Sequence, residues 1–526
     1  MGDLLLGIDV GTTAVKAAIV DTRGNLLAAC QAEYPIFHVR STWVEQNPED
    51  WWQATCQVVR QSLSGVSHAP ERILSLAVSS QGPTLLPLDR SGKPLGRAMI
   101  WMDRRAAAEA QWLSDIIGAD EIYQVTGNRP DPYFIASRLL WMKNHEPEQL
   151  ARACLFVQVN GYINHRLTGC WTLDHVQAAL LQLRDYSTGE WSPTLCNACG
   201  VNPSQFPDVF PGDQVQGEVT SRAAEETGLR RGTPVMVGTV DSCAAALEAG
   251  VIEPGVAVEM SGTSTVFMLP NNRGLTEPRL IAQPHVVSGT QFLFGAMVSS
   301  GASLRWFRDQ LGNTDISGLN ADSFDSLTEQ AGQVSVGSDG VIFLPYMMGE
   351  RSPLWNTNAR GAFIGLSLTT RRKAMVRAIL EGVSFALRHN MDVAISAGAE
   401  IREVRCVGGC SRSDVWNQIK ADVLGRPFLL PRHPIGAAFG DAILAGVGAG
   451  VFVDIRKCLR EMVQIERRFE PNQSNHERYM SIYSLFLKLY QDLKEDFDLL
   501  AEFTQISAGS QASVTEPSSL SPRRCQ

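Results

Sequence analysis

The sequence lacks the features that would connect it to a membrane or to a nucleic acid. No apolar run approaches the roughly 20 residues that a membrane-spanning helix needs, and a strand pattern begins at Leu4 without a preceding secretory signal. Basic residues are not gathered in long runs, and the net charge at neutral pH is −9. We therefore expect a cytoplasmic protein with a small-molecule partner, no nucleic acid and no membrane. A homodimer is one assembly that the sequence leaves open.

Cysteines are scattered, and metal-ligand spacing is absent. The 526 residues include 11 cysteines and 9 histidines, and the odd cysteine count without framework spacing favours reduced thiols over disulfides. Cys196 and Cys199 form a Cys-x-x-Cys pair, but no second pair or neighbouring histidine completes a zinc site. The length is sufficient for two domains, each with its own hydrophobic core.

The G-x-x-x-x-G-K-[ST] phosphate loop is also missing, but residues 4–21 offer another candidate. Two apolar strands flank the turn Gly11-Thr12-Thr13, whose N–H groups and hydroxyls can hold phosphate oxygens. Asp9, near the end of the first strand, could hold a divalent cation directly or through water. A plain surface hairpin is an equally good interpretation of this segment taken alone.

A second copy of the pattern changes that balance. Residues 256–269 repeat the plan of strand, Gly262-Thr263-Ser264 turn and strand. Two such hairpins, about half a chain apart, predict a duplicated core with a nucleotide held between its halves. The second hairpin has Glu259 and Met260 where the first has Ile8 and Asp9. Only the first hairpin is therefore predicted to bind a metal ion.

Polar residues follow two further predicted strands. The strand at 73–79 leads into Gln81, at the type of strand end where ligands bind in open α/β sheets. A strand from Ala98 ends in Trp101, Asp103 and Arg104. A carboxylate, a guanidinium and an indole face so close together can clamp a polyhydroxylated ligand. Alternatively, Asp103 caps the helix that the following residues favour. Both interpretations stay open.

Asp241 is the acid with the most distinctive setting. A buried strand at 235–237 runs through Gly238 into Asp241, which opens an Ala-rich helix. One interpretation is a helix cap, whose carboxylate would have a low pKa. The other is a general base, because the same position projects the carboxylate from a strand end into an interdomain cleft, where it could accept a proton from a hydroxyl.

Near the C-terminal end, a strand at 404–407 leads into Gly408-Gly409 and then into a helix that contains Asn417. Two glycines before a helix N-terminus let a flat ring or a phosphate approach the backbone closely. Residues 507–526 are rich in Ser, Pro, Gly and Gln, a composition typical of a disordered tail.

Taken in order, these motifs resemble the FGGY carbohydrate kinase family, on its xylulokinase-like branch, within the actin, Hsp70 and sugar kinase superfamily. The resemblance spans residues 4–490. It is carried by Asp9-x-Gly-Thr-Thr, Trp-x-Asp103-x-Arg, Asp241 before the Ala-rich helix, Ser-Gly262-Thr263-Ser, Ala-Arg-Gly361-x-Phe-x-Gly365-Leu, and Gly408-Gly409 with Trp416.

The resemblance implies an α/β fold with two ribonuclease H-like (actin-like ATPase) domains and a central interdomain cleft. Residues 1–248 would form the N-terminal sugar-binding domain, and residues 249–500 the C-terminal nucleotide-binding domain. ATP and Mg²⁺ are the implied cofactors. The implied roles are Asp9 for magnesium; Gly11, Thr12, Thr13, Gly262 and Thr263 for phosphates; Gly408, Gly409 and Asn417 for adenosine; Gln81, Trp101, Asp103 and Arg104 for the sugar; and Asp241 as the base.

The sugar loop departs from the family pattern. Xylulokinase-like members have Gln-Met-His-Gly where this chain has Gln81-Gly82-Pro83-Thr84, and the Arg-Glu pair of glycerol kinase-like members is absent. Cys410 replaces the third glycine of the adenosine motif, whereas the loop Gly349–Pro353 is similar to that of xylulokinases and gluconate kinases. We expect phosphorylation of a primary hydroxyl of a ketopentose such as xylulose.

Two alternatives remain. One is a kinase for a sugar acid or sugar alcohol, such as gluconate, erythritol or a glycerol-like acceptor. The other is a nucleotide switch similar to Hsp70 or actin. Asp103 and Asp241 argue against the switch, because a pure switch needs no clamp for a polyol.

Overall fold

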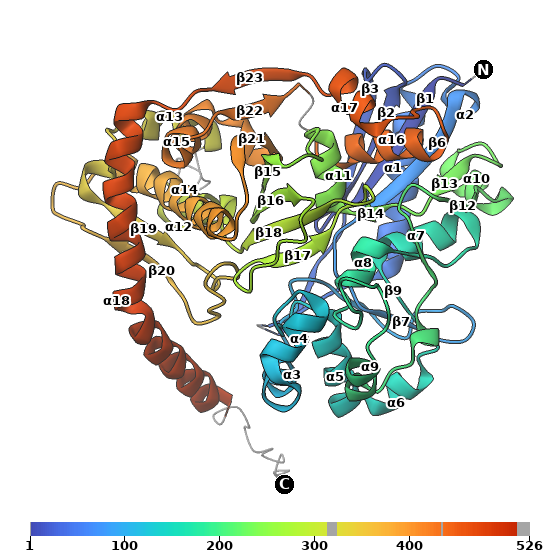
Figure 1. The fold of residues 1–526 in the computed structure, drawn as a ribbon, viewed down its shortest axis with the longest axis horizontal. Coiled ribbons are helices and arrows are strands. Elements are labelled where there is room, and N and C mark those ends of the chain that lie inside the picture. The colour runs from blue at the N-terminus through green and yellow to red at the C-terminus, as the bar shows by residue number, and fades with distance from the viewer. Residues whose placement is uncertain (1, 41, 313–322, 433–434, 513–526) are drawn as a thin grey trace, which may run out of the picture.

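Two mixed β-sheets, each covered by helices, organise the chain. The structure is a computed structural model that describes residues 2–40, 42–312, 323–432 and 435–512. Figure 1 shows the sheet of the N-terminal half, in blue and green, on one side of the molecule, and the sheet of the C-terminal half, in green to orange, on the other. The two sheets share one strand order, as the next two paragraphs describe.

The first sheet has the order β12-β13-β6-β1-β2-β3, and β14 also pairs with β6. The strands β1, β2 and β3 form an antiparallel meander, whereas β6 runs parallel to β1 and β13 parallel to β6. The bounds are β1 Leu4–Val10, β2 Ala14–Asp21, β3 Leu26–Glu33, β6 Ile73–Ser80, β12 Val215–Glu218, β13 Pro234–Met236 and β14 Thr239–Val240.

The second sheet has the order β17-β18-β16-β15-β21-β22-β23. Again three antiparallel strands, β15, β16 and β18, are followed by two parallel neighbours, β21 and β22. The predicted duplicated core is therefore confirmed. The bounds are β15 Gly255–Ser261, β16 Thr265–Asn271, β17 Ile281–Pro284, β18 Gln291–Met297, β21 Ile401–Val407, β22 Phe428–Pro431 and β23 Ile465–Phe469.

Helix α1 (Pro48–Ser64) illustrates how the sequence positions the covering helices. Its N-cap Asn47 accepts a hydrogen bond from the backbone N–H of Glu49, and Pro48 has no N–H to leave unpaired at this end. Trp51 and Trp52 are fully buried on its inner face, in one core with strands β1 and β2. Such large apolar side chains dominate the burial that holds a helix on a sheet.

The other helices and short strands complete the two halves. Further helices are α3 Ala107–Leu113, α5 Ile135–His145, α8 His175–Ala179, α12 Gly301–Leu311, α13 Phe324–Gly332, α14 Arg372–Ser396, α15 Asp414–Leu424 and α18 Gln473–Ala512. Short strand pairings join β4 Phe37–Arg40, β5 Trp43–Gln46 and β8 Ala98–Met99, then β7 Leu86–Leu88 with β9 Leu155–Val157, and β19 Ile342–Pro345 with β20 Gly361–Ile364.

Two helices, α11 (Asp241–Glu248) and α16 (Ala437–Gly448), connect the two halves. Helix α16 lies between β22 and β23 of the second sheet in the sequence, yet it packs on β1 and β6 of the first (Figure 1). A Cβ on Gly7 would lie only 1.8 Å from the carbonyl oxygen of Ala438, so α16 can lie this close to β1 only over a glycine. One hydrophobic core consequently contains residues from both sheets and both helices.

Two boundaries differ from the sequence-based expectation. Helix α3 begins at Ala107 with no side-chain cap, so the predicted capping role of Asp103 is wrong, and strand β8 ends at Met99. Helix α18 continues to Ala512, so residues 507–512 of the predicted tail are helical, and residues 513–526 lie outside the described part. Among the described helices, none combines the length and the hydropathy that crossing a bilayer requires.

Candidate active site

The first polar turn, Gly11–Thr13, joins β1 to β2 as predicted, and neighbouring side chains hold it. The amide nitrogen Nε2 of Gln46 donates to the carbonyl oxygen of Thr12 at 2.7 Å. The indole Nε1 of Trp101 donates to the hydroxyl Oγ1 of Thr12 at 2.9 Å. Because Trp101 contacts Thr12 directly, a predicted sugar-binding residue and a predicted phosphate-binding residue lie side by side.

Asp9 lies just before this turn and is 6 % exposed. Its oxygen Oδ1 is buried without a hydrogen-bond partner. Burial raises the pKa of the Asp9 carboxyl to about 6, opposed by the positive charge of Lys16, which faces it on β2. A buried carboxylate oxygen without a partner is costly unless a cation or a proton satisfies it, and Mg²⁺ prefers oxygen ligands. The chemistry of Asp9 therefore fits magnesium.

Asp241 is the first residue of α11, and Val240 occupies the N-cap position before it. Burial, followed by the negative charge of Asp9, raises the pKa of Asp241 to about 8, and smaller effects of Ser242 and Lys16 oppose the rise. Because Val240 and not Asp241 occupies the N-cap position, the helix-cap interpretation is wrong. An acid whose pKa lies close to neutral pH suits a general base.

The buried acids predict how stability depends on pH. Burial raises the pKa of Glu350 to about 7 and that of Asp241 to about 8, above the values near 4 of unfolded chains. The folded protein then binds more protons than the unfolded one, so its free energy of unfolding falls as pH rises through these folded pKa values. We expect a lower melting temperature at about pH 8.5 than at about pH 6.5 in nucleotide-free, metal-free calorimetry. Asp241→Asn should reduce this slope, and an unchanged slope would refute the assignment.

The predicted sugar residues Trp101 and Arg104 belong to a larger polar and aromatic wall. Arg104 pairs with Asp131 at 2.7 Å, and both side chains are partly exposed. The guanidinium of Arg351 lies 5.2 Å from the ring centres of both Trp101 and Tyr133. Asp131, Tyr133 and Arg351 were not predicted as site residues. The Asp-Pro-Tyr and Gly-Glu-Arg-Ser-Pro segments were the available signal, and only the fold brings them together.

Asp103 is engaged elsewhere. It is fully buried, and its oxygens accept hydrogen bonds from the backbone N–H of Val44 at 2.7 Å and from the guanidinium of Arg105 at 2.8 to 3.0 Å. A sugar hydroxyl could reach this carboxylate only by displacing Arg105. The geometry therefore gives no support to direct sugar binding by Asp103 and makes it an anchor behind the wall of Trp101 and Arg104.

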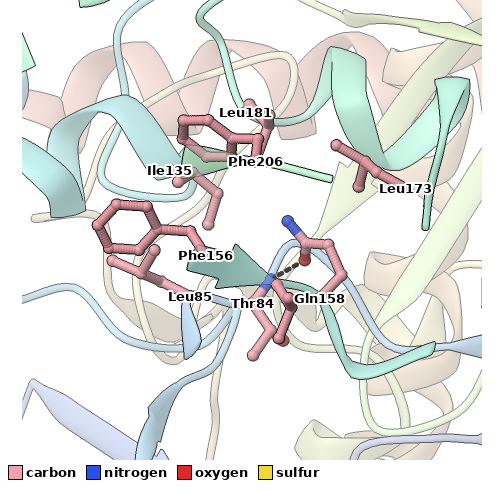
Figure 2. Close-up of a pocket in the computed structure, with 9 residues that line it drawn as sticks. Thr84, Leu85, Ile135, Phe156, Gln158, Leu173, Leu181 and Phe206 are labelled. Atoms are coloured by element: carbon pink, nitrogen blue, oxygen red, sulfur yellow. Dashed lines mark hydrogen bonds between the residues drawn. The ribbon is translucent and has the colours of Figure 1, made fainter. Parts of the chain in front are cut away.

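The Gln81 loop is held firmly beside this wall. Gln81 donates to Gln46 at 2.5 Å, and its own oxygen Oε1 is buried without a partner. Figure 2 shows the backbone N–H of Thr84 donating to Gln158 Oε1, at 2.7 Å, beside an apolar gap. That gap has no room for a water-sized sphere, so we interpret it as a packing feature. Gln81 is itself fully buried, so the structure gives no direct support to sugar binding by its side chain.

The second polar turn, Gly262–Ser264, joins β15 to β16 and is braced by α12. The backbone N–H of Ser300 donates to the carbonyl oxygen of Thr263 at 3.0 Å, and that of Gly301 to Gly262 at 3.1 Å. The buried hydroxyls of Ser299, Ser300 and Ser303 have no partner in the described structure. Exposed backbone at Gly262 and Thr263, beside these hydroxyls, fits phosphate oxygens.

Glu259 lies behind the second turn and is not available to a metal. It forms a 2.6 Å ion pair with Lys420, and both side chains are almost fully buried. Lys420 also donates to the hydroxyl of Ser261, the last residue before the turn. This arrangement agrees with the expectation that only the first hairpin steers a cation.

The predicted adenosine residues form one loop against the second turn. A Cβ on Gly408, where φ is 91°, would lie 2.5 Å from the carbonyl oxygen of Ser261, so glycine is required there. Gly409 has nothing within 4 Å of its Cβ position and presents bare backbone. Asn417 is fully buried and donates to the carbonyl oxygen of Ser411 at 2.7 Å. It holds the loop from beneath, and Gly409 forms its open surface.

One acid of the site was missed by the sequence analysis. Asp441, on α16, is fully buried and accepts a hydrogen bond from Ser79 at 2.6 Å. The signal was a single acid inside the otherwise uncharged stretch 437–448. It could not be assigned to the site because the sequence does not show that α16 packs on the first sheet.

Comparison with known proteins identifies the family. The model of the N-terminal domain of the FGGY family of carbohydrate kinases matches residues 4–248, and that of the C-terminal domain matches residues 257–449. A xylulose kinase of Bacillus subtilis (strain 168) is 28 % identical over 493 residues, which cover 93 % of this chain and 97 % of that protein. A gluconokinase of the same organism is 26 % identical, with 96 % and 98 % covered.

The comparison of structures agrees. The crystal structure of xylulose kinase from Rhodospirillum rubrum has a TM-score of 0.84 and 29 % identity, and the match covers 94 % of this chain and all of that one. The α/β fold with two actin-like ATPase domains is thereby confirmed. The chain belongs to the FGGY family of carbohydrate kinases and is an ATP-dependent sugar kinase.

Proposed function

We propose that this kinase transfers the γ-phosphate of ATP, with Mg²⁺, to a primary hydroxyl of a ketopentose such as xylulose. The observation that carries the proposal is the hydrogen bond between Trp101 on the sugar wall and Thr12 in the phosphate turn. This contact would hold an acceptor bound at the wall next to phosphates bound at the turn. The similarity to xylulose kinases supports the ketopentose as acceptor.

Because ATP is the donor, we place the reaction in the cytoplasm. The homodimer stays a prediction.

The residues of the candidate active site would have different roles in phosphoryl transfer. Asp9 would hold magnesium, which when bound neutralises charge on the β- and γ-phosphates. The turns Gly11–Thr13 and Gly262–Ser264 would hold the phosphate oxygens from two sides. Asp241 would orient the attacking hydroxyl and accept its proton late in the reaction, since the transition state is loose. The charge of Asp9 raises the pKa of Asp241, which supports a shared role for the two acids.

A screen of acceptors tests the proposal. ATP consumption is measured with ketopentoses, tetritols, pentitols, glycerol and aldonates, each against an acceptor-free control. We expect the greatest stimulation with a ketopentose. Stimulation by an aldonate alone would move the assignment to a sugar acid. Bound nucleotide with no stimulation by any acceptor would favour a nucleotide switch.

A sugar acid is the second candidate, because two guanidinium groups, Arg104 and Arg351, line the wall and could pair with a carboxylate. Arg104→Gln should raise the KM for the acceptor by roughly tenfold with kcat little changed, since a charge-assisted hydrogen bond contributes about 1.5–3 kcal/mol. Steady-state kinetics measures this change. The control is Arg222→Gln at an exposed surface pair with Glu226. An unchanged KM for every active acceptor would remove Arg104 from the site.

A further inference from the structure

Asp441 occupies a position where an acid is costly. Helix α16 carries no other charged residue, and Asp441 is fully buried in its middle. Its neighbours Ala438 and Ala442 lie within 3 Å of the position that a Cβ on Gly7 would take, so small apolar side chains suit this contact with β1. Burying a carboxylate without full compensation costs several kcal/mol in a typical protein, roughly the scale of whole-domain stability. An alanine would pack here without that cost.

The partners of Asp441 place it beside the predicted magnesium residue. Its oxygen Oδ2 accepts the hydroxyl of Ser79 at 2.6 Å. Ser79 on β6 pairs in register with Asp9 on the parallel strand β1, and residues paired in this way present their side chains to the same face of a sheet. Asp441 and Asp9 therefore meet over one face.

Each of these two carboxylates has an oxygen that the protein does not satisfy. Oδ1 of Asp441 and Oδ1 of Asp9 are both buried and have no hydrogen-bond partner among the residues that the structure describes. No ion pair found among the described residues includes either side chain. The pKa of Asp441 is raised well above its usual value, first by burial and then by the charges of Asp9 and Asp241, while Ser79 opposes the rise. When ionised, these acids would repel one another, and a cation held among them would relieve that repulsion.

The geometry does not support direct coordination of a metal ion by several of these acids at once. Within the described ranges, no three His, Cys, Asp or Glu side chains are arranged to hold one ion between them. Mg²⁺ usually keeps several of its waters and takes one or two carboxylates from the protein. A carboxylate behind such an ion would accept hydrogen bonds from its waters.

We infer that Asp441 is a positioning residue of the magnesium site, where its free oxygen accepts a hydrogen bond from a magnesium-bound water and Ser79 fixes its orientation. The inference rests on the proposed magnesium-dependent reaction. It also ties the cation to α16, the helix through which the nucleotide-binding half of the sequence packs on the sheet of Asp9. Metal affinity would then depend on the contact between the two halves.

The test measures cation binding without turnover. Mn²⁺ serves as the probe, and its binding to the full-length protein with saturating ADP is followed by electron paramagnetic resonance. Residues that orient a metal site through hydrogen bonds typically change affinity by 10–100-fold. We expect Asp441→Asn to raise the Kd for Mn²⁺ by roughly tenfold or more, and Ser79→Ala to raise it by a smaller factor, with metal-free ADP affinity unchanged in both.

Ser75→Ala is the matched control. Ser75 lies on the same strand as Ser79 and donates to the carbonyl oxygen of Ala445 on α16 at 2.9 Å, so it loses an equivalent contact at the same interface without touching a carboxylate. We expect wild-type Mn²⁺ affinity for this variant.

The possible outcomes distinguish a failure of the proposed role of Asp441 from a failure of the proposed magnesium-dependent reaction. Wild-type Mn²⁺ affinity in a folded Asp441→Asn variant overturns the inference, whatever the loss of stability, and leaves the kinase assignment intact. If Asp441→Asn does not fold, wild-type affinity in Ser79→Ala overturns it instead. Failure of the wild-type protein to bind Mn²⁺ with ADP overturns the magnesium-dependent reaction itself, and the inference with it.

Discussion

Replacing Asp241 with asparagine should lower kcat by roughly 10²–10⁴-fold and leave nucleotide affinity nearly unchanged. Asparagine has almost the same shape but cannot accept the proton of the attacking hydroxyl. Val240 and not Asp241 occupies the N-cap position of α11, so the substitution leaves the cap residue in place. Removal of a buried acid whose pKa is raised to about 8 should not reduce stability at neutral pH. The measurement is steady-state kinetics with the best acceptor, together with calorimetric titration of ADP.

A matched control is Asp115→Asn, an exposed aspartate that accepts a hydrogen bond from Gln111 on the same helical segment. It should retain wild-type kcat. If Asp241→Asn kept more than about a tenth of the wild-type kcat, the base role would be untenable given the usual range for this kind of catalysis. Asp9 and Asp441 would then be the remaining acids to examine.

Replacing Lys420 with methionine should destabilise the protein by about 3–5 kcal/mol, because it leaves Glu259 buried without its cation. The pair is 2.6 Å apart and nearly solvent-free, and the second oxygen of Glu259 already lacks a partner. Urea unfolding monitored by circular dichroism measures the loss. The variant should also bind nucleotide more weakly, since Lys420 donates to Ser261 beside the second phosphate turn.

The double variant Glu259→Leu/Lys420→Met distinguishes two causes of instability. One is the loss of attraction within the ion pair, and the other is the cost of leaving the Glu259 carboxylate buried without a partner. Removing both charges should recover most of the stability, because a buried ion pair is seldom worth more than well-packed apolar side chains. Lys457→Met, at an exposed pair with Glu461, should change stability by less than about 1 kcal/mol. A single Lys420 variant as stable as the Lys457 control would contradict the buried-charge argument.

Local patterns carried much of what could be predicted. The two hairpins could be read from glycine and hydroxyl residues between apolar strands, because turn chemistry is a property of adjacent residues. Asp241 was identifiable because a buried strand and an Ala-rich helix flank it in sequence. Helix α1 likewise has local signals, because its N-terminal proline and first-turn acids are neighbours in the sequence.

The remainder depends on contacts between distant segments. Asp441 lies in the site only because α16 packs on β1 and β6. No residue next to Asp441 in the sequence indicates that packing. A sugar-binding role of Asp103 is one of two interpretations that the sequence leaves open and the one that the family resemblance implies, and the structure does not support it because Val44 and Arg105 occupy its oxygens. The buried pair of Glu259 and Lys420 is likewise invisible until β15 and α15 are placed together.

Identification of the phosphorylated atom tests the central claim most directly. The product made from ATP and the best acceptor is examined by proton-coupled ³¹P nuclear magnetic resonance. Transfer to a primary hydroxyl predicts a phosphomonoester signal split by the two protons of a CH₂ group and formed in equal amount to ADP. With Asp241→Asn the same signal should form roughly 10²–10⁴-fold more slowly. A signal split by a single proton, or release of inorganic phosphate in place of an ester, would contradict the account.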